Sequence, residues 1–207
     1  MAFGTRPFPS RADRPAQDGP RGVGDGAGPG KAADPVDAAR QICLNQLEHA
    51  PRTRAQLADR LRSKGVADDV AEQVLSRFAE VGMIDDALFA QLWVTSRHRG
   101  KGLARRALTQ ELRRKGVADE QVAEAVALLD PDVELATARA LVDRRLRTTA
   151  GLPAETRVRR LAGMLARKGY PAGAAFRVVK EALAAEGVEA ELAFDELAAL
   201  DDEPPGS

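Results

Sequence analysis

Several residue types are scarce in this 207-residue chain, and each scarcity excludes a class of protein. There is a single cysteine, Cys43, so the chain cannot close an internal disulfide bond, which fits a reducing compartment. The two histidines, His49 and His98, are too few for a cysteine and histidine cluster with metal-site spacing. No apolar run approaches the ~18 residues of a membrane span, and the N-terminus has no apolar signal core. We therefore expect a cytoplasmic protein with no cofactor, no metal and no membrane partner.

Aromatic residues are also scarce, at 4% of the chain, whereas charged residues make up 30%. A core with so few aromatic side chains must be built mainly from leucine, valine and alanine. Leucine and alanine favour helices, and sheets prefer β-branched and aromatic residues. The composition therefore predicts an all-α fold.

A ten-residue pattern occurs three times along the chain. The copy LTQELRRKGV at 108–117 is related to LADRLRSKGV at 57–66 and to LAGMLARKGY at 161–170. Each copy carries Leu, Leu, Lys and Gly at the same relative positions, and the glycine suits the left-handed turn that ends a helix. Copies of one pattern at regular intervals along the chain are typical of a tandem repeat. We predict three tandem three-helix modules forming an elongated, curved repeat array.

The composition changes at both ends of the repeats. The N-terminal segment is rich in glycine and proline and too poor in aliphatic residues to offset the entropy cost of ordering, which predicts a disordered tail. The C-terminal segment is acidic. The predicted parts are a tail at 1–35, modules at 36–82, 83–130 and 131–187, and the acidic segment at 188–207.

Polar residues ahead of the apolar helical runs indicate where helices begin. Thr53 is the predicted N-cap of the helix that contains the first copy of the repeat, and Asp68 or Asp69 is predicted to cap the next. Asp85 is the predicted N-cap of the helix that opens the second module, with Asp86 in its first turn.

In that helix Phe89, Leu92 and Trp93 have the spacing i, i+3, i+4, which predicts that they share one face. Phe89 and Trp93 are predicted to pack into the core between modules.

No catalytic constellation is present in the sequence. Neither His49 nor His98 belongs to a known nucleophile pattern, and both are predicted to be ordinary side chains near helix ends. Cys43 is predicted to be a buried, inert thiol. The sequence Gly-Lys-Gly at 100–102 lacks the upstream glycine and the following Ser or Thr of a phosphate-binding loop. We therefore predict that the protein is not an enzyme.

Charge is distributed unevenly, although the formal net charge is +0. No lysine or arginine follows Lys180, whereas nine acidic residues do. Residues 97–115 contain eight basic residues and the single acid Glu111, a net charge of 8 − 1 = +7. Such a segment attracts a phosphate backbone or an acidic protein groove. The structural alternative is a solvated helix face with i, i+4 ion pairs.

Basic residues in the second and third modules are the candidates for partner binding. Sequence-specific reading of DNA is less attractive, because the three repeats share apolar and turn positions rather than polar residues that could read bases. The candidates are Arg97, Arg99, Lys101, Arg105, Arg106, Arg113, Arg114, Lys115, Arg144, Arg145, Arg147, Arg157 and Arg160.

The motifs IDDALFA, WVTSR and ELRRKG occur in this order, and together they resemble the RecX family of bacterial regulatory proteins. The resemblance extends over 38–186; the Gly/Pro-rich tail and the acidic end are not part of it. Most of the matching positions also have a structural explanation as caps or core residues. They are Asp85, Asp86, Phe89, Ala90, Trp93, Ser96, Arg97, Glu111, Leu112, Lys115 and Gly116.

The resemblance implies a particular partner and activity. It implies an all-α, cytosolic protein that lodges along the filament of the RecA recombinase and restrains its ATPase and strand exchange. DNA repair, homologous recombination and the SOS response are the expected context, and the single- or double-stranded DNA within the filament is a further expected partner. We expect a monomer. The alternative is a helical DNA-binding module that acts on nucleic acid directly.

Overall fold

The computed structural model describes residues 34–187 of the chain. The acidic C-terminal segment and all but the last two residues of the predicted N-terminal tail therefore lie outside the described residues.

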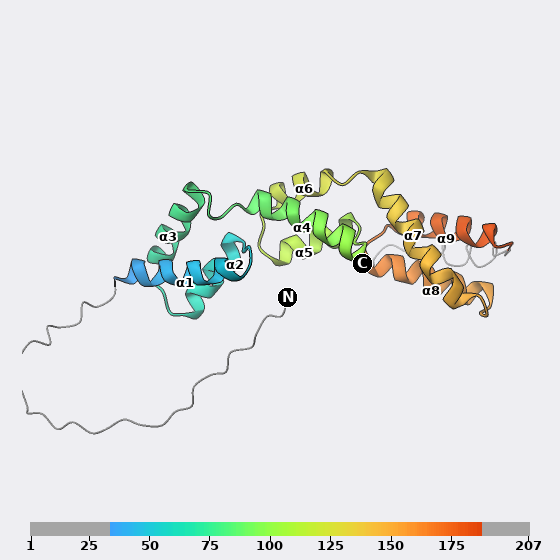
Figure 1. Cartoon of the computed structure of the whole chain (residues 1–207), viewed down its shortest axis with the longest axis horizontal. Coiled ribbons are helices and arrows are strands. Elements are labelled where there is room, and N and C mark those ends of the chain that lie inside the picture. Colours follow the sequence, from blue (N-terminus) through green and yellow to red (C-terminus); the bar gives the residue numbers. More distant parts are fainter. Residues whose placement is uncertain (1–33, 188–207) are drawn as a thin grey trace, which may run out of the picture. The chain divides into compact units, whose positions relative to one another are not determined.

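Residues 34–187 form nine α-helices and contain no strand, which confirms the prediction of an all-α fold (Figure 1). The helices are α1 (Pro35–His49), α2 (Arg54–Ser63), α3 (Asp68–Glu80), α4 (Asp86–Lys101), α5 (Arg105–Arg114), α6 (Asp119–Ala127), α7 (Pro131–Thr149), α8 (Ala154–Arg167) and α9 (Ala172–Ala185).

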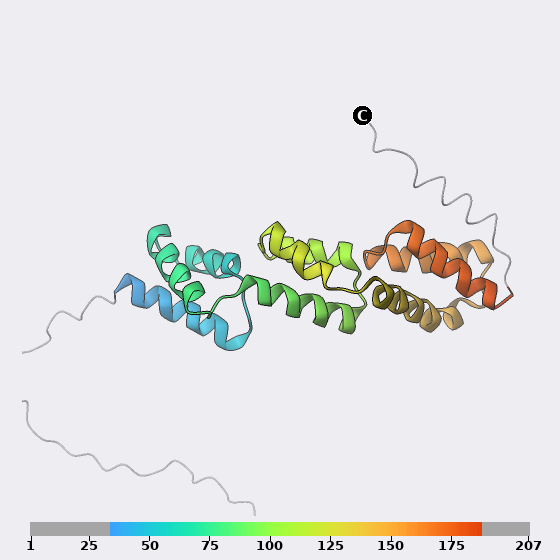
Figure 2. The same cartoon turned by 90° about the horizontal axis from the view of Figure 1, so that it is seen from above.

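The helices pack in three groups of three, each around its own apolar core (Figures 1 and 2). We call them module 1 (α1–α3), module 2 (α4–α6) and module 3 (α7–α9). The two leucines of each repeat lie at the centre of its module's core, because leucines four residues apart fall on the same side of a helix. These leucines, each at most 1% exposed, are Leu57 and Leu61, Leu108 and Leu112, and Leu161 and Leu165.

The helix starts confirm two of the predicted caps. The hydroxyl of Thr53 accepts a hydrogen bond from the backbone N–H of Gln56, and the Gln56 side chain accepts one from the N–H of Thr53. This reciprocal pair is a capping box, which satisfies two backbone donors of α2. Asp85 caps α4, and its carboxylate accepts from the N–H of Leu88 at 2.8 Å.

The predicted cap of α3 was wrong. Ala67 occupies the N-cap position and makes no side-chain cap, so Asp68 and Asp69 already belong to the first helical turn. Two negative charges in that turn still stabilise α3, because they face the positive end of the helix dipole.

The predicted apolar face of α4 needs a correction at Leu92, which is 58% exposed. The buried face of α4 is centred on Ala90 and Val94, and Leu92 points away from it because each residue turns a helix by about 100°. Phe89 is buried, while Trp93 is half-buried at the edge of the same core.

Neighbouring modules meet through two similar junctions. Between modules 1 and 2, the hydroxyl of Thr53 donates to the carbonyl of Lys115 at 2.6 Å. Between modules 2 and 3, the N–H of Ala104 donates to the carbonyl of Lys168 at 2.8 Å. In both junctions the N-terminus of a second helix, α2 or α5, therefore contacts the lysine that ends the second helix of the next module.

A carboxylate from the next module completes each junction. Asp86 accepts from the backbone N–H of Arg54 at 2.9 Å, and Glu134 accepts from the N–H of Arg105 at 2.8 Å. Both donors are N–H groups of a first helical turn, which have no partner within their own helix. The first helix of each following module thus satisfies a donor of the preceding module.

The repeat glycines have left-handed backbone conformations, with φ of 74° at Gly65, 76° at Gly116 and 88° at Gly169. Two of them also allow close contact between modules. A Cβ on Gly116 would lie 2.3 Å from the Cβ of Ala55, and one on Gly169 would lie 2.4 Å from the backbone nitrogen of Ala107. Gly65 lies in module 1, which has no preceding module to contact, and it has no such neighbour within 4 Å. The glycine therefore ends a helix in every module and permits close packing in the last two.

Candidate partner-binding site

One group of predicted residues forms a compact cluster between α4 and α5, which we call the Trp93 cluster. The guanidinium carbon of Arg97 and the Nζ of Lys115 each lie 4.0 Å from the Trp93 ring centroid. The ring of Phe89 stacks on Trp93 at 5.6 Å between centroids. The indole N–H of Trp93 donates to Glu111 at 2.8 Å. Cation–π contacts and this hydrogen bond thus fix two positive charges beside one aromatic side chain.

The Trp93 cluster holds more positive than negative charge. Glu111 is the carboxylate recorded in it, 3.6 Å from the Nε of Arg97. The pKa of Lys115 is lowered, first by partial burial and then by the positive charges of Arg97 and Arg52, against the opposing effect of Glu111. Arg52 comes from module 1, and its Nε is buried without a hydrogen-bond partner among the described residues. An anionic ligand would therefore lower the electrostatic energy of the cluster.

A second group of positive charges, the Lys168 cluster, lies where modules 2 and 3 meet. The Nζ of Lys168 donates to the carbonyl of Lys101 at 2.5 Å. The pKa of Lys168 is lowered, first by partial burial and then by the positive charges of Arg144, Arg145 and Lys101. The groups come from the ends of α4 and α8 and from α7, so the fold concentrates positive charge that the sequence distributes over three helices.

Most of the predicted binding residues are exposed. Eight of the thirteen are exposed and form no ion pair with any residue in 34–187, so they remain candidates for partner binding. They are Arg99, Lys101, Arg106, Arg114, Arg144, Arg145, Arg147 and Arg160. Arg113 is also exposed, but its Nε lies 2.7 Å from the carboxylate of Asp119.

Two predicted binding residues are structural instead. Arg157 is 3% exposed and pairs with Glu186, so it cannot contact a partner from where it lies. Arg105 donates to the carbonyl of Leu129, and its Nε lies 3.7 Å from Glu134, which ties α5 to the start of module 3. We remove Arg157 from the binding surface and treat Arg105 as a junction residue.

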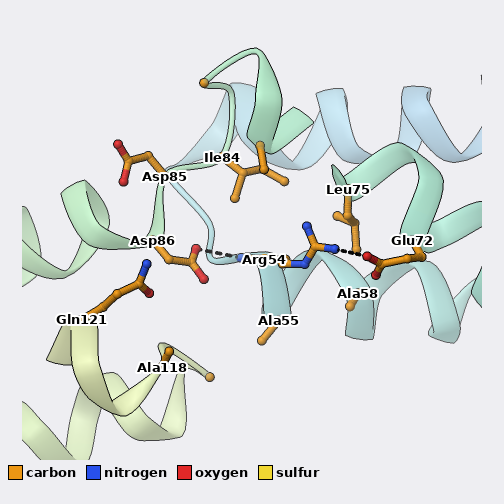
Figure 3. Close-up of a pocket in the computed structure, with 13 residues that line it drawn as sticks. Arg54, Ala55, Ala58, Glu72, Leu75, Ile84, Asp85, Asp86, Ala118 and Gln121 are labelled. Carbon is orange, nitrogen blue, oxygen red and sulfur yellow. Dashed lines mark hydrogen bonds and ion pairs between the residues drawn. The ribbon is translucent and has the colours of Figure 1, made fainter. Parts of the chain in front are cut away.

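A cavity of about 610 Å³ lies at the junction of modules 1 and 2 (Figure 3). Glu72 and Asp86 face Arg54 in it, whereas Asp85 points away (Figure 3). The guanidinium of Arg54 lies 2.5 Å from Glu72, and burial raises the pKa of the Asp86 carboxyl. Each of the three carboxylates accepts a hydrogen bond from a neighbouring protein group. We therefore interpret these acids as junction and capping residues.

His98 and Cys43, two of the residues with reactive side chains, are both buried. His98 is 4% exposed, with its Nδ1 2.8 Å from the carbonyl of Leu103 and its Nε2 3.0 Å from the hydroxyl of Thr137. It is thus a buried link between α4 and α7 rather than an ordinary helix-end side chain. Cys43 is buried as predicted, and burial raises the pKa of its thiol, which disfavours the reactive thiolate.

Two side chains that matter here were absent from the predicted set. Lys168 has the same repeat position as Lys115, so the repeat itself carried the signal. No sequence signal pointed to Arg52, because its proximity to Lys115 depends on how module 1 packs against module 2.

Within 34–187 no three metal-ligating side chains come together. No helix of that region is both long and apolar enough to cross a membrane.

The fold and the surface define a class: an all-α protein of three tandem three-helix modules whose basic clusters lie near the junctions. Models of the RecX first, second and third three-helix domains match residues 39–78, 85–126 and 132–179. The chain belongs to the RecX family of regulatory proteins, as its motifs predicted.

Similar proteins include the regulatory protein RecX of Thermobifida fusca (strain YX), 60% identical over 78% of this chain and 89% of the relative. The regulatory protein RecX of Streptomyces coelicolor is 57% identical over 79% of this chain and 87% of its own. The crystal structure of RecX from Lactobacillus salivarius superposes with a TM-score of 0.67 at 19% identity, covering 72% of this chain and 97% of that chain, which supports the fold.

The Trp93 cluster gives a direct prediction about stability. Trp93→Ala should lower the free energy of unfolding by about 3 kcal/mol, because it removes ring packing, two cation–π contacts and a hydrogen bond. Trp93→Phe keeps a ring and should cost about 1 kcal/mol. Urea unfolding followed by circular dichroism measures both. An unchanged midpoint for Trp93→Ala would show that the ring contributes no packing energy.

Proposed function

We propose that this protein binds the RecA filament on DNA and inhibits its ATPase and strand-exchange activities without catalysing a reaction itself. The observation that supports the proposal most directly is the set of exposed basic residues in modules 2 and 3 that have no ion-pair partner among the described residues. Relatives with 57% and 60% identity are named regulatory protein RecX, which is consistent with a regulator of RecA.

The modular fold suits a filament as partner. Each module has its own core, so successive modules can contact successive subunits or phosphates of the filament. Several weak contacts made together give a high overall affinity. Basic residues on the surface complement a DNA backbone or an acidic groove and increase the rate of association. A protein that occupies the groove of the RecA filament in this way would be sufficient to inhibit the filament.

A RecA ATPase assay on single-stranded DNA tests the proposal. Protein at or below the RecA concentration should reduce hydrolysis and strand exchange at low salt, and inhibition should weaken as salt rises because the contacts are electrostatic. Unchanged hydrolysis and unchanged strand exchange at low salt would contradict it.

Charge reversal at Arg99 and Arg106 connects this inhibition to the surface. Both side chains are exposed and unpaired among the described residues, so Arg99→Glu with Arg106→Glu should weaken inhibition and leave the unfolding midpoint nearly unchanged. The control, Arg40→Glu with Arg60→Glu, makes the same charge change on exposed positions of module 1. Equal loss of inhibition in both variants would attribute the effect to net charge alone. Arg105 is unsuitable for this test because it holds a module junction.

The alternative function is direct action on nucleic acid as a helical DNA-binding module. It predicts tight, strongly salt-dependent binding to naked DNA. The regulator proposal predicts instead that RecA on the DNA adds affinity beyond that of DNA alone.

A further inference from the structure

A small pocket in module 3 is lined by three arginines and no acidic residue. Its volume is about 310 Å³, and it lies between the C-terminal half of α7 and α8. The arginines are Arg145, Arg160 and Arg167, and the other lining residues are Thr148, Thr149, Leu161 and Met164. We call it the triple-arginine pocket.

The three guanidinium groups are available to a ligand. All three arginines are exposed, and none forms an ion pair with a residue in 34–187. The hydroxyl of Thr148 already donates to the carbonyl of Arg145 at 2.8 Å, and that of Thr149 to the carbonyl of Leu146 at 2.9 Å. The donors that remain free are therefore the arginine N–H groups, and each guanidinium presents five in a planar fork suited to oxyanions.

A buried hydrogen bond between Arg157 and Thr149 holds the wall of the pocket in place. Arg157 is 3% exposed, and its Nε donates to the hydroxyl of Thr149 at 3.4 Å. Its other end pairs with Glu186, so α7, α8 and the end of α9 are held together beside the pocket. Because this contact is buried, the pocket wall is part of the folded module.

The surroundings favour a ligand with repeated negative charges. Arg145 lines the pocket, and its positive charge is one of those that lower the pKa of Lys168. The pocket therefore adjoins the Lys168 cluster, which also contains Arg144 and Lys101. A single carboxylate would neutralise a small part of this charge. A nucleic-acid backbone carries one negative charge per phosphate, and binding releases the counterions condensed on it. We propose that the triple-arginine pocket binds a phosphate group of a nucleic-acid backbone, with the next phosphates running toward the Lys168 cluster.

Arg145→Gln, Arg160→Gln and Arg167→Gln, combined in the full chain, test the proposal. The matched control is Arg40→Gln, Arg60→Gln and Lys64→Gln, which removes three exposed positive charges from module 1. Fluorescence anisotropy measures binding of a labelled oligonucleotide across a salt series, without RecA. One arm uses single-stranded DNA and the other uses a duplex. Circular dichroism and urea unfolding establish that both variants fold.

The pocket variant is expected to bind about tenfold more weakly at low salt, and the negative slope of log affinity against log salt should become less steep by about 1. The control should keep the slope of the unchanged protein. Loss in the single-stranded arm, the duplex arm or both supports the pocket and identifies the form of nucleic acid that it takes.

Three results would contradict the proposal. Equal loss of oligonucleotide binding in the pocket variant and the control would show a general charge effect. If the unchanged protein does not bind the oligonucleotide at low salt, nucleic acid is not the ligand of the pocket. Unchanged DNA binding with lost inhibition of RecA would assign the pocket to an acidic protein surface. Unchanged inhibition of RecA with weakened DNA binding would support the pocket, so the proposal can succeed or fail separately from the proposed function.

Discussion

Replacing Gly169 by alanine is expected to lower the free energy of unfolding by about 2 to 5 kcal/mol. Gly169 has φ of 88°, where a Cβ clashes with its own backbone. The added Cβ would also lie 2.4 Å from the backbone nitrogen of Ala107 and 2.7 Å from its Cβ. A backbone atom within a helix cannot rotate away, so modules 2 and 3 must separate locally.

Gly65→Ala is the matched control for Gly169→Ala. Gly65 has φ of 74° and no neighbour within 4 Å of the added Cβ, so alanine there incurs only the backbone cost of about 1 to 2 kcal/mol. Urea unfolding gives the loss of unfolding free energy for each variant. The difference between the two losses is the cost of the clash with Ala107 at the junction. The same cost at both positions would show that the contact with Ala107 relaxes freely, and the glycine would then be a helix end and nothing more.

The sequence was sufficient to predict the local features of the fold. Leucine spacing and a glycine after each lysine are set by the geometry of a single helix and its end, so the three modules followed from the repeat. The close approach of Gly169 to Ala107 was not predictable, because it depends on how two modules pack. The same reason applies to Asp86, whose contact with Arg54 spans 32 positions.

The candidate site was predicted in part. Counting charge along 97–115 ignores acids from other elements, and Glu134 and Asp119 in fact pair with Arg105 and Arg113. Arg157 was misassigned although a signal was present. It precedes the buried Leu161 by four residues, so it lies on the inner face of α8.

That burial leads to the second large effect: Arg157→Ala should lower the free energy of unfolding by about 3 kcal/mol. The change leaves a cavity beside Thr149 and removes the partner of Glu186. Arg157→Met fills most of the same space with an apolar chain, and the Glu186 side chain is 37% exposed, so water can solvate its charge. Methionine should therefore cost less than about 1.5 kcal/mol, measured by urea unfolding.

Arg159→Ala supplies the exposed comparison, because Arg159 pairs weakly with Glu155 at 3.9 Å and should cost less than about 0.5 kcal/mol. The methionine variant then separates the two roles of Arg157. If the residue is structural, folded Arg157→Met inhibits the RecA ATPase as strongly as the unchanged protein. If inhibition is lost while the unfolding midpoint is retained, Arg157 must leave its buried position to contact the partner, and our assignment of it is wrong.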